Sequence, residues 1–359
     1  MNGGLFITLY DEKTLTLYLK YGIYGFLMKP VFGDQPATQS RHYQALADYA
    51  CSREGAHVFF FLKRKIVYGG RVKGNTDIAS FYLNGDSSPM GRKANAELFW
   101  DESDRYKKTD KNGVFKVDGN EKAQPYILMF DEIEELTGKY ISSDDLYFEL
   151  GQYPFPLPSN SIQGMSFCTL TPGETEVALE QIEKNGKQIL LESNENMALD
   201  NDVTIFNKEY LDNEYINEAH LEFSILADLS PLFNLINNNN YILCRQVPIS
   251  PFKPFNMDRA DICLYDIEKP INNGTVPNII IELKKQRANF HAYEQVVRYL
   301  KWLEKITNEE EFKSVKAIIV AESFFVNPQK IDLRYNDMIT MYSYKEKKIY
   351  NLKLGTTKQ

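Results

Sequence analysis

The strongest constraint on the fold is an alternation of buried and amphipathic segments in the last third of the chain. Two short apolar runs, residues 278–283 (NIIIEL) and 314–322 (SVKAIIVAE), flank a long amphipathic stretch at 288–306. Short apolar runs are typical of buried strands, and spacing of apolar residues along one face is typical of a helix. The pattern therefore predicts an α/β domain built around a mixed sheet.

The segments just before this region fit the same architecture. A helix is expected at 218–229, where apolar residues are spaced along one face and Pro231 follows. Strands are expected at 241–249 and 260–267, where apolar and polar residues alternate, and residues 272–274 (Asn-Asn-Gly) predict a turn.

The N-terminal half has a different texture, because short β-like runs are separated by turn residues. This predicts a small, mainly antiparallel barrel. The expected strands are 5–10, 57–72 (a hairpin), 80–85, 125–130 and 145–150, and the expected helices are 40–53 and a segment from Pro172 to Gly186. A polar, acidic stretch follows, so the predicted organisation is a domain at 1–190, a linker at 191–207 and a second domain at 208–359, α+β overall.

Length and composition support two folded domains. The chain has 359 residues, 43% of them hydrophobic and 25% charged, which excludes a largely disordered, collagenous or coiled-coil protein. No run approaches the roughly 18–20 apolar residues of a spanning helix, and the first residues lack the basic segment of a secretion signal, so a cytoplasmic location is expected. The net charge of −8 argues only weakly against a nucleic-acid partner, because phosphate binding depends on local basic surface.

Cysteine and histidine patterns point to no chemistry. The four cysteines are far apart and form no CxxC pair, so buried free thiols are expected rather than a zinc site or disulfides: Cys51, Cys168, Cys244 and Cys263. The four histidines show no paired spacing and are interpreted as structural or surface residues: His42, His57, His220 and His291.

The chemistry-bearing pattern lies at the end of the strand at 278–283. Residues two apart on a strand share a face, so Glu282 and Lys284 should project together while Ile281 and Leu283 point into the core. The turn after 260–267 can fold Asp261 toward Glu282, and two converging carboxylates suit a hard cation such as Mg²⁺.

Neighbouring helices can add further polar groups to this pair of acids. Glu218, on the helix at 218–229, can supply a third carboxylate, and Glu222 is a competing choice one turn later. On the helix at 288–306, Gln295 and Tyr299 are spaced i, i+4 and so lie on one face. Core packing is the expected role of Tyr299, and a charge at the helix start is the alternative role of Glu218.

These elements in this order resemble the PD-(D/E)xK nucleases, and among them the NucS-like catalytic domain. The matching segments are NEAHLE (217–222), RADI (259–262), IELKK (281–285) and YEQVVRYLKWL (293–303). One departure is Asp258, which stands where that family commonly has Gly before the Arg.

The resemblance implies a role for each matching residue. Asp261 and Glu282 would bind Mg²⁺, for which Mn²⁺ would substitute, and Glu218 would assist them directly or through water. Lys284 would orient or activate the attacking water, and Gln295 would support the cluster.

The N-terminal half resembles, less extensively, PUA-like modules of the EVE or YTH type, which read modified bases. The residues that carry this resemblance are GAHVFFFLKRKIVYGGRVKG (55–74) and LYFELGQYPFPLPSNSIQGMSFCTLTPGE (146–174). The resemblance implies an aromatic pocket for a flipped base. Candidate pocket residues are Phe99, Trp100, Tyr153 and Phe155, with Asn160 and Ser161 as hydrogen-bonding groups; core packing is the alternative for each aromatic. Candidate phosphate contacts are Lys63, Arg64 and Lys65, followed by Arg71 and Lys73, with a solvated hairpin face as the alternative.

Together the two resemblances favour a Mg²⁺-dependent DNA endonuclease of bacteria or archaea. A modification-dependent restriction or phage-defence enzyme is the leading hypothesis, with double-stranded DNA as partner and a homodimer for cutting both strands. The alternatives are a repair nuclease acting on mismatched or branched DNA and a non-catalytic nucleic-acid-binding protein built on a nuclease-like scaffold.

Overall fold

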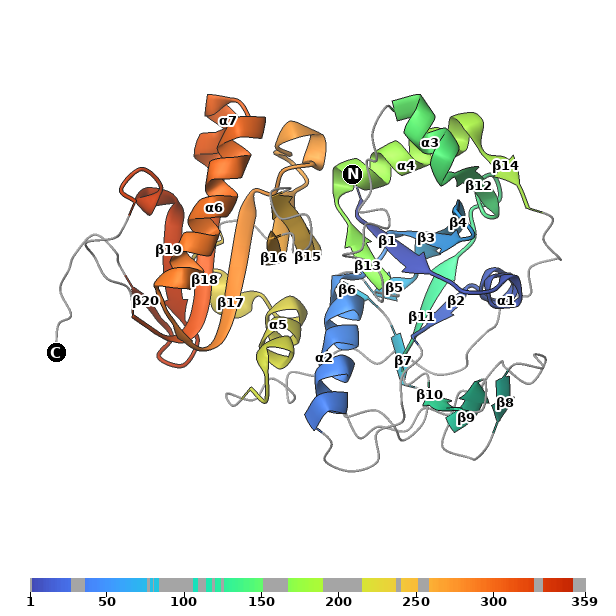
Figure 1. The fold of residues 1–359 in the computed structure, drawn as a ribbon, viewed down its shortest axis with the longest axis horizontal. Helices are drawn as coiled ribbons and strands as arrows, with labels where there is room; N and C mark the ends of the chain where they lie inside the picture. The colour runs from blue at the N-terminus through green and yellow to red at the C-terminus, as the bar shows by residue number, and fades with distance from the viewer. Residues whose placement is uncertain are drawn as a thin grey trace.

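The computed structural model describes thirteen segments of the chain, and the statements below concern these: residues 2–26, 36–75, 78–79, 81–83, 106–108, 114–117, 120–123, 126–150, 167–189, 215–236, 240–250, 258–325 and 332–350. They form a mixed α+β protein with a main sheet in each half (Figure 1). This agrees with the predicted class at the level of mixed sheets flanked by helices. Among the described helices, none is long and apolar enough to cross a membrane.

The N-terminal sheet is mixed, because β1 pairs in parallel with β3 while its other neighbour β13 is antiparallel. The described path is β13-β1-β3-β4-β11-β2, with β12 and β14 joined through β4, and β7 joined to β11. Its strands are β1 (Gly4–Thr8), β2 (Ile23–Gly25), β3 (His57–Leu62), β4 (Lys65–Val72), β7 (Phe81–Leu83), β11 (Tyr126–Asp131), β12 (Lys139–Ser142), β13 (Phe167–Leu170) and β14 (Lys187–Gln188). Smaller pairings involve β5 (Gly74–Asn75) with β6 (Ile78–Ala79), and β8 (Tyr106–Lys108), β9 (Val114–Val117) and β10 (Asn120–Ala123).

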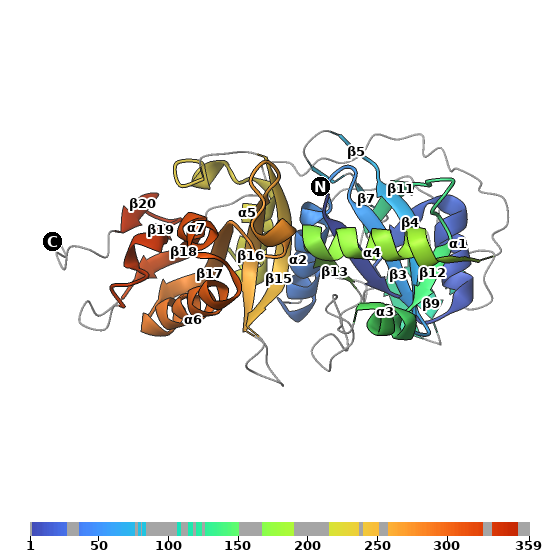
Figure 2. The ribbon, with the colours of Figure 1, turned by 90° about the horizontal axis from the view of Figure 1, so that it is seen from above.

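Helices cover both faces of this sheet. Helices α1 (Glu12–Tyr21) and α2 (Pro36–Cys51) pack on one face, and α3 (Ser143–Leu150) and α4 (Pro172–Asn185) on the other (Figure 2). The predicted start and stop of α4 are confirmed. Thr171 and Glu174 form a reciprocal capping box, and the chain leaves the helix at Gly186.

The strand predicted at 145–150 is wrong, because this segment belongs to helix α3. Its apolar residues alternate like those of a strand, but helix-starting chemistry outweighs the alternation. The Ser142 hydroxyl accepts a hydrogen bond from the Asp145 backbone N–H at 2.9 Å, and Asp144 and Asp145 place negative charge in the first turn.

The C-terminal half holds the sheet predicted from the apolar runs. Its strand order is β15-β16-β17-β18-β19-β20, in which β17, β18 and β19 are parallel neighbours and the other pairs are antiparallel. The strands are β15 (Tyr241–Ser250), β16 (Asp258–Asp266), β17 (Ile279–Ala288), β18 (Lys316–Phe324), β19 (Ile339–Ser343) and β20 (Lys348–Tyr350). The helices are α5 (Glu218–Ala227), α6 (Phe290–Ile306) and α7 (Glu309–Ser314), with short 3-10 turns η3 (Ser230–Leu232), η4 (Asn272–Gly274) and η6 (Asn336–Met338).

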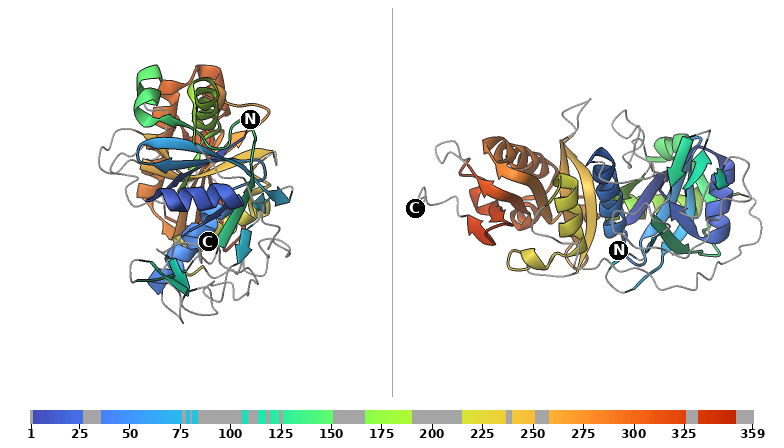
Figure 3. Two further views of the ribbon diagram at one scale, coloured as in Figure 1. Left: turned by 90° about the vertical axis from the view of Figure 1, so that its right-hand side faces the viewer. Right: turned by 90° about the horizontal axis from the view of Figure 1, so that it is seen from below.

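Helix α6 covers one face of this sheet, and α5 covers the other together with the N-terminal half. One buried hydrophobic cluster includes Leu46 and Tyr49 of α2, Phe223 of α5, and Ile281 and Leu283 of β17. Helices α2 and α5 therefore lie side by side between the two sheets (Figure 3). The predicted linker, 191–207, lies outside the described residues, and segments on both sides of it share this core.

Close contacts reinforce the junction between the halves. The Tyr43 ring stacks on the buried His220 ring with centroids 4.1 Å apart, and Arg53 donates to the Leu226 carbonyl at 3.2 Å. At Gly173, near the start of α4, an added Cβ would lie 2.4 Å from the Thr275 side chain that follows η4. A side chain at that position would force Thr275 or the nearby backbone to shift.

His57, at the start of β3, is buried inside the N-terminal half. Its Nδ1 lies 2.9 Å from the hydroxyl of Tyr68, which is fully buried. Burial, helped by the positive charges of Arg71 and the N-terminus, lowers the pKa of His57 to about 4. The folded protein thus holds this ring neutral at pH values where an unfolded chain would protonate it.

We expect His57 to make the protein less stable as the pH falls. Because the pKa of His57 is lower in the folded state, its contribution to the free energy of unfolding falls as the pH drops from about 6.5 to about 4. From pH 7 to pH 5 the free energy of unfolding should decrease by about 2 kcal/mol on this account. Urea unfolding of wild type and His57→Gln across this range measures the difference at each pH. His291→Gln, at an exposed position, is the control. Equal slopes for wild type and His57→Gln would contradict the assignment.

Candidate active site

Strands β16 and β17 separate at the predicted catalytic residues. Their described pairing runs only over residues 262–264 of β16, ending where Ile262 pairs with Ile281. One residue further, the Asp261 carboxylate replaces a strand partner, because its Oδ2 accepts the Leu283 backbone N–H at 2.7 Å. The Asp261 carboxylate therefore lies against β17 and is held there by the Leu283 backbone N–H.

Glu282 and Lys284 project to the same side of β17, as their spacing predicts. Lys284 Nζ donates to Glu282 Oε1 at 2.7 Å and to the Leu283 carbonyl at 2.9 Å. The Glu282 side chain is only 1% exposed, whereas that of Lys284 is 31% exposed. Ile281 and Leu283 point into the core on the opposite face, which confirms the predicted alternation.

Burial and like charge destabilise the ionised carboxylates in this cluster. Desolvation first, and then the charges of Glu282 and Glu222, raise the pKa of Asp261 well above its ordinary value. Desolvation also raises the pKa of Glu282, against the opposing effect of Lys284, and Glu218 adds to the rise. The negative charge of the acids around Lys284 is therefore larger than the positive charge that Lys284 supplies.

Lys284 remains a cation in this setting. Burial acts to lower the pKa of Lys284, and the negative charges of Glu282 and Asp261 act to raise it. The combined effect of the charges is larger, so the pKa of Lys284 lies above its ordinary value. An ammonium with a raised pKa donates hydrogen bonds and does not accept a proton. This favours orientation of a water or a phosphate oxygen over deprotonation of the nucleophile.

The two candidate acids on α5 have different environments. Glu218, in the first turn, is exposed, and its charge acts on both Glu282 and Lys284. Glu222 is 5% exposed and accepts two hydrogen bonds from Arg245, at 2.9 and 2.7 Å. Glu222 is thus held by a buried guanidinium, while Glu218 is exposed to solvent and near enough for its charge to act on the cluster.

Helix α6 contributes the predicted i, i+4 pair. Gln295 Nε2 donates to the Tyr299 hydroxyl at 2.6 Å. That hydroxyl lies 2.7 Å from the Arg259 carbonyl and 3.5 Å from Glu282 Oε2. Tyr299 is fully buried, as expected for core packing, but its hydroxyl also reaches the edge of the acidic cluster.

Asp258, the departure from the family pattern, is engaged at the surface beside α6. Its carboxylate pairs with Arg298, with Nε 3.0 Å from Oδ2. This ion pair links the start of β16 to the helix and holds the segment that carries Asp261.

The predicted base-pocket residues Phe99, Trp100, Tyr153, Phe155, Asn160 and Ser161 lie outside the described residues. The basic hairpin between β3 and β4 is described, and Lys63 and Arg64 both adopt positive φ, 49° and 64°. Lys63 pairs with Glu12 at 3.0 Å, Arg64 with Asp144, and Lys65 lies 4.6 Å above the Tyr140 ring. Of the two further basic residues, Arg71 is exposed and Lys73 pairs with Asp131 at 2.7 Å.

The structure also places the cysteines and three of the histidines. Within the described residues all four cysteines are free thiols, and Cys51, Cys244 and Cys263 are buried. His57 and His220 are buried in the packing described above, and His291 is exposed beside Glu294. The side chain of His42 is not among the described ones.

No protein-family model and no curated protein matches this chain. Two solved structures show partial similarity. A structure of an EndoMS–dsDNA2 complex is 20% identical, with 28% of this chain and 36% of that chain covered and a TM-score of 0.18. A crystal structure of a repair endonuclease from Pyrococcus abyssi is 25% identical, with 27% and 39% covered and a TM-score of 0.18. This chain thus spans less than two fifths of either one.

The donor set fits a hard cation held by two carboxylates. Among the described residues, no three histidine, cysteine or acidic side chains form a ready-made metal cluster. Mg²⁺ often binds through only one or two carboxylates and fills its other positions with water and phosphate oxygens. Asp261 and Glu282 offer oxygen ligands of that kind, and a cation beside them would offset the excess of negative charge.

If Asp261 and Glu282 bind Mg²⁺, the binding should release protons and strengthen as the pH rises. The raised pKa values of Asp261 and Glu282 mean that protons occupy these carboxylates more readily than usual, and the metal must displace them. Titration calorimetry at about pH 6 and about pH 8, in buffers of different ionisation enthalpy, measures both effects. Asp261→Asn should bind weakly at either pH. An affinity independent of pH would argue against these ligands.

Proposed function

We propose that this protein is a Mg²⁺-dependent endodeoxyribonuclease, which hydrolyses phosphodiester bonds at the cluster of Asp261, Glu282 and Lys284. The observation that carries the proposal is the pair of carboxylates at the point where β16 and β17 separate, with a lysine ammonium 2.7 Å from one of them. An acidic cluster beside a fixed cation suits a reaction in which a phosphate develops negative charge.

In this proposal Asp261 and Glu282 hold Mg²⁺. The metal would supply positive charge to the scissile phosphate and lower the pKa of a bound water. The Leu283 N–H and Gln246 hold the Asp261 carboxylate, so its direction is set before the substrate arrives.

The remaining residues orient the reactants. Lys284, as a permanent cation, donates to the attacking water or to a phosphate oxygen. The water gives up a proton to solvent as its oxygen forms the new bond to phosphorus, the bond to the leaving sugar oxygen breaks, and that oxygen takes a proton from solvent. Gln295 orders the Tyr299 hydroxyl near Glu282 and thereby supports the cluster.

Double-stranded DNA is the proposed partner, bound by a homodimer. Beyond Lys284 the same strand carries the exposed Arg287, whose guanidinium lies 4.6 Å above the ring of Phe325, itself 62% exposed. An exposed cation on an aromatic ring suits phosphate contact and base stacking. We further propose that the N-terminal half reads a modified base, which would make the protein a modification-dependent restriction or defence enzyme.

Removal of any member of the cluster should abolish DNA cleavage. Asp261→Asn, Glu282→Gln and Lys284→Ala should each lower the cleavage rate by about 100-fold or more, because each removes charge that stabilises the transition state. Cleavage of plasmid and phage DNAs, with and without base modifications, is measured in Mg²⁺ and in EDTA. Glu268→Gln, at an exposed turn, is the control. Activity in EDTA, or wild-type activity in Glu282→Gln, would rule out the assignment.

Glu218→Gln and Glu222→Gln should separate activity from stability. Glu218 is exposed and its charge acts on the cluster, so its loss should lower cleavage and change thermal stability little. Glu222→Gln breaks a buried ion pair and should lower the unfolding free energy by about 3–5 kcal/mol, with a smaller effect on cleavage by the folded protein. The reverse order of cleavage rates would move the catalytic role to Glu222.

A further inference from the structure

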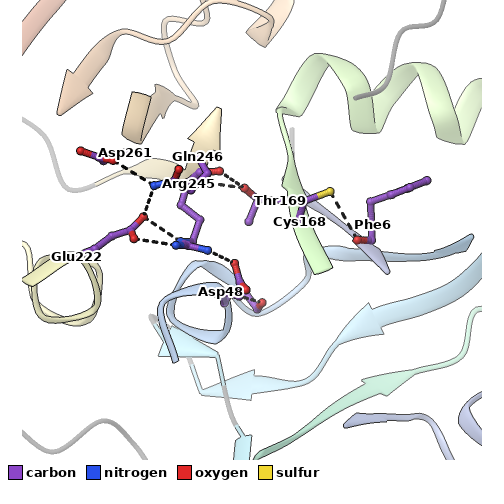
Figure 4. Close-up of polar contacts among 9 residues, drawn as sticks. Phe6, Asp48, Cys168, Thr169, Glu222, Arg245, Gln246 and Asp261 are labelled. Carbon is purple, nitrogen blue, oxygen red and sulfur yellow. Dashed lines mark hydrogen bonds and ion pairs between the residues drawn. The ribbon is translucent and has the colours of Figure 1, made fainter. Parts of the chain in front are cut away.

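One polar side chain near the cluster belongs to none of the matching sequence segments. Gln246, on β15, donates from its amide nitrogen to Asp261 Oδ1 at 3.1 Å and to Glu222 Oε1 at 3.3 Å. Both partners are carboxylates, which only accept hydrogen bonds when ionised, so the –NH₂ end of the amide must face them. One neutral group thus bridges two acids that repel each other (Figure 4).

The backbone at Gln246 is in an unusual conformation for its residue type. Its φ is +53°, in the left-handed region that favours glycine and disfavours a side chain such as Gln. A residue held there costs free energy, and such residues cluster at functional sites. In this conformation the Gln246 amide reaches Asp261. Glycine would adopt the same backbone more easily, but it has no side chain to make that contact.

The preceding residue anchors this arrangement in the N-terminal half. Arg245 is buried, and it donates to Glu222 through Nε and Nη2 and to Asp48 of α2 through Nη1 at 2.6 Å. Its backbone N–H also donates to Thr169 of β13 at 3.0 Å. Glu222, the acid that Gln246 bridges to Asp261, is therefore fixed by Arg245, whose guanidinium is bonded to α2 and whose backbone is bonded to β13.

We infer that Gln246 is a positioning residue for the metal-binding carboxylate of Asp261, and that Asp48 acts on the same carboxylate through Arg245 and Glu222. The inference rests on the proposed metal site. With the Leu283 N–H on one carboxylate oxygen and Gln246 on the other, Asp261 has donors on both sides, and its rotation is restricted. The N-terminal half is then part of the catalytic geometry in addition to any role in selecting DNA.

Gln246→Gly tests the positioning role without harming the fold. This change removes the amide and relieves the cost of positive φ, so thermal stability should be unchanged or higher. Asn273→Gly is the matched control, because Asn273 has the same φ of 53° but lies in the η4 turn, among none of the cluster's contacts. Mn²⁺ binding to the full-length protein, without DNA, is followed by the electron paramagnetic resonance signal of free Mn²⁺.

We expect Gln246→Gly to bind Mn²⁺ about tenfold more weakly than wild type, as is usual when a group that orients a metal ligand is removed. Asn273→Gly should bind like wild type, and Asp261→Asn should bind weakly. Binding by Gln246→Gly within about twofold of wild type would overturn the positioning role.

The link to the N-terminal half is tested with Asp48→Asn. In the wild-type background this change should weaken Mn²⁺ binding, and in the Gln246→Gly background it should have no further effect, because the path is already broken. Additive effects, or none in either background, would overturn the link.

Failure of the proposed function is distinguishable from failure of this inference. Wild-type protein that binds no more Mn²⁺ than Asp261→Asn would remove the metal site, and the inference with it. If the variants bind Mn²⁺ with the expected order of affinities but the protein cuts no DNA, only the proposed nuclease activity would be rejected.

Discussion

The buried guanidinium of Arg245 is the interaction on which the arrangement of the two halves depends. Its side chain is 6% exposed and lies between Glu222, also 6% exposed, and Asp48, 14% exposed. Removing such charges from water is expensive, and the geometry offsets the expense only if all hydrogen bonds are made. The ion pairs therefore contribute less to net stability than to fixing the relative positions of α2, α5 and β15, since few other arrangements of these elements would satisfy all three charges.

These fixed positions explain why the candidate site lies beside the junction between the halves. One hydrophobic cluster continues from the N-terminal sheet through α2 and α5 to the inner face of β17. The opposite face of β17 carries Glu282, and the neighbouring strand β16 carries Asp261. The site thus lies on a strand packed on both faces, which limits movement of its carboxylates.

The site itself is destabilising for the fold, as the raised pKa values of Asp261 and Glu282 indicate. Two acids withdrawn from water beside a single lysine are retained against an energetic penalty, and such clusters are typical of functional positions. The positive φ of Gln246 is a second local penalty in the same place. Both fit a site in which charge placement takes precedence over stability.

The sequence alone determined the local patterns, and tertiary structure decided how they were used. Periodicity was sufficient for β17, α6 and β18, and for the shared face of Glu282 and Lys284, because these depend on repeats of 2 and 3.6 residues. It failed at α3, where capping outweighed alternation, and it missed α1, which Asp11 caps. The different environments of Glu218 and Glu222, and the role proposed for Gln246, depend on Arg245 and Asp48, about 200 residues apart in the chain. Contacts over such a separation leave no periodic trace in one sequence, so only the packed structure could reveal them.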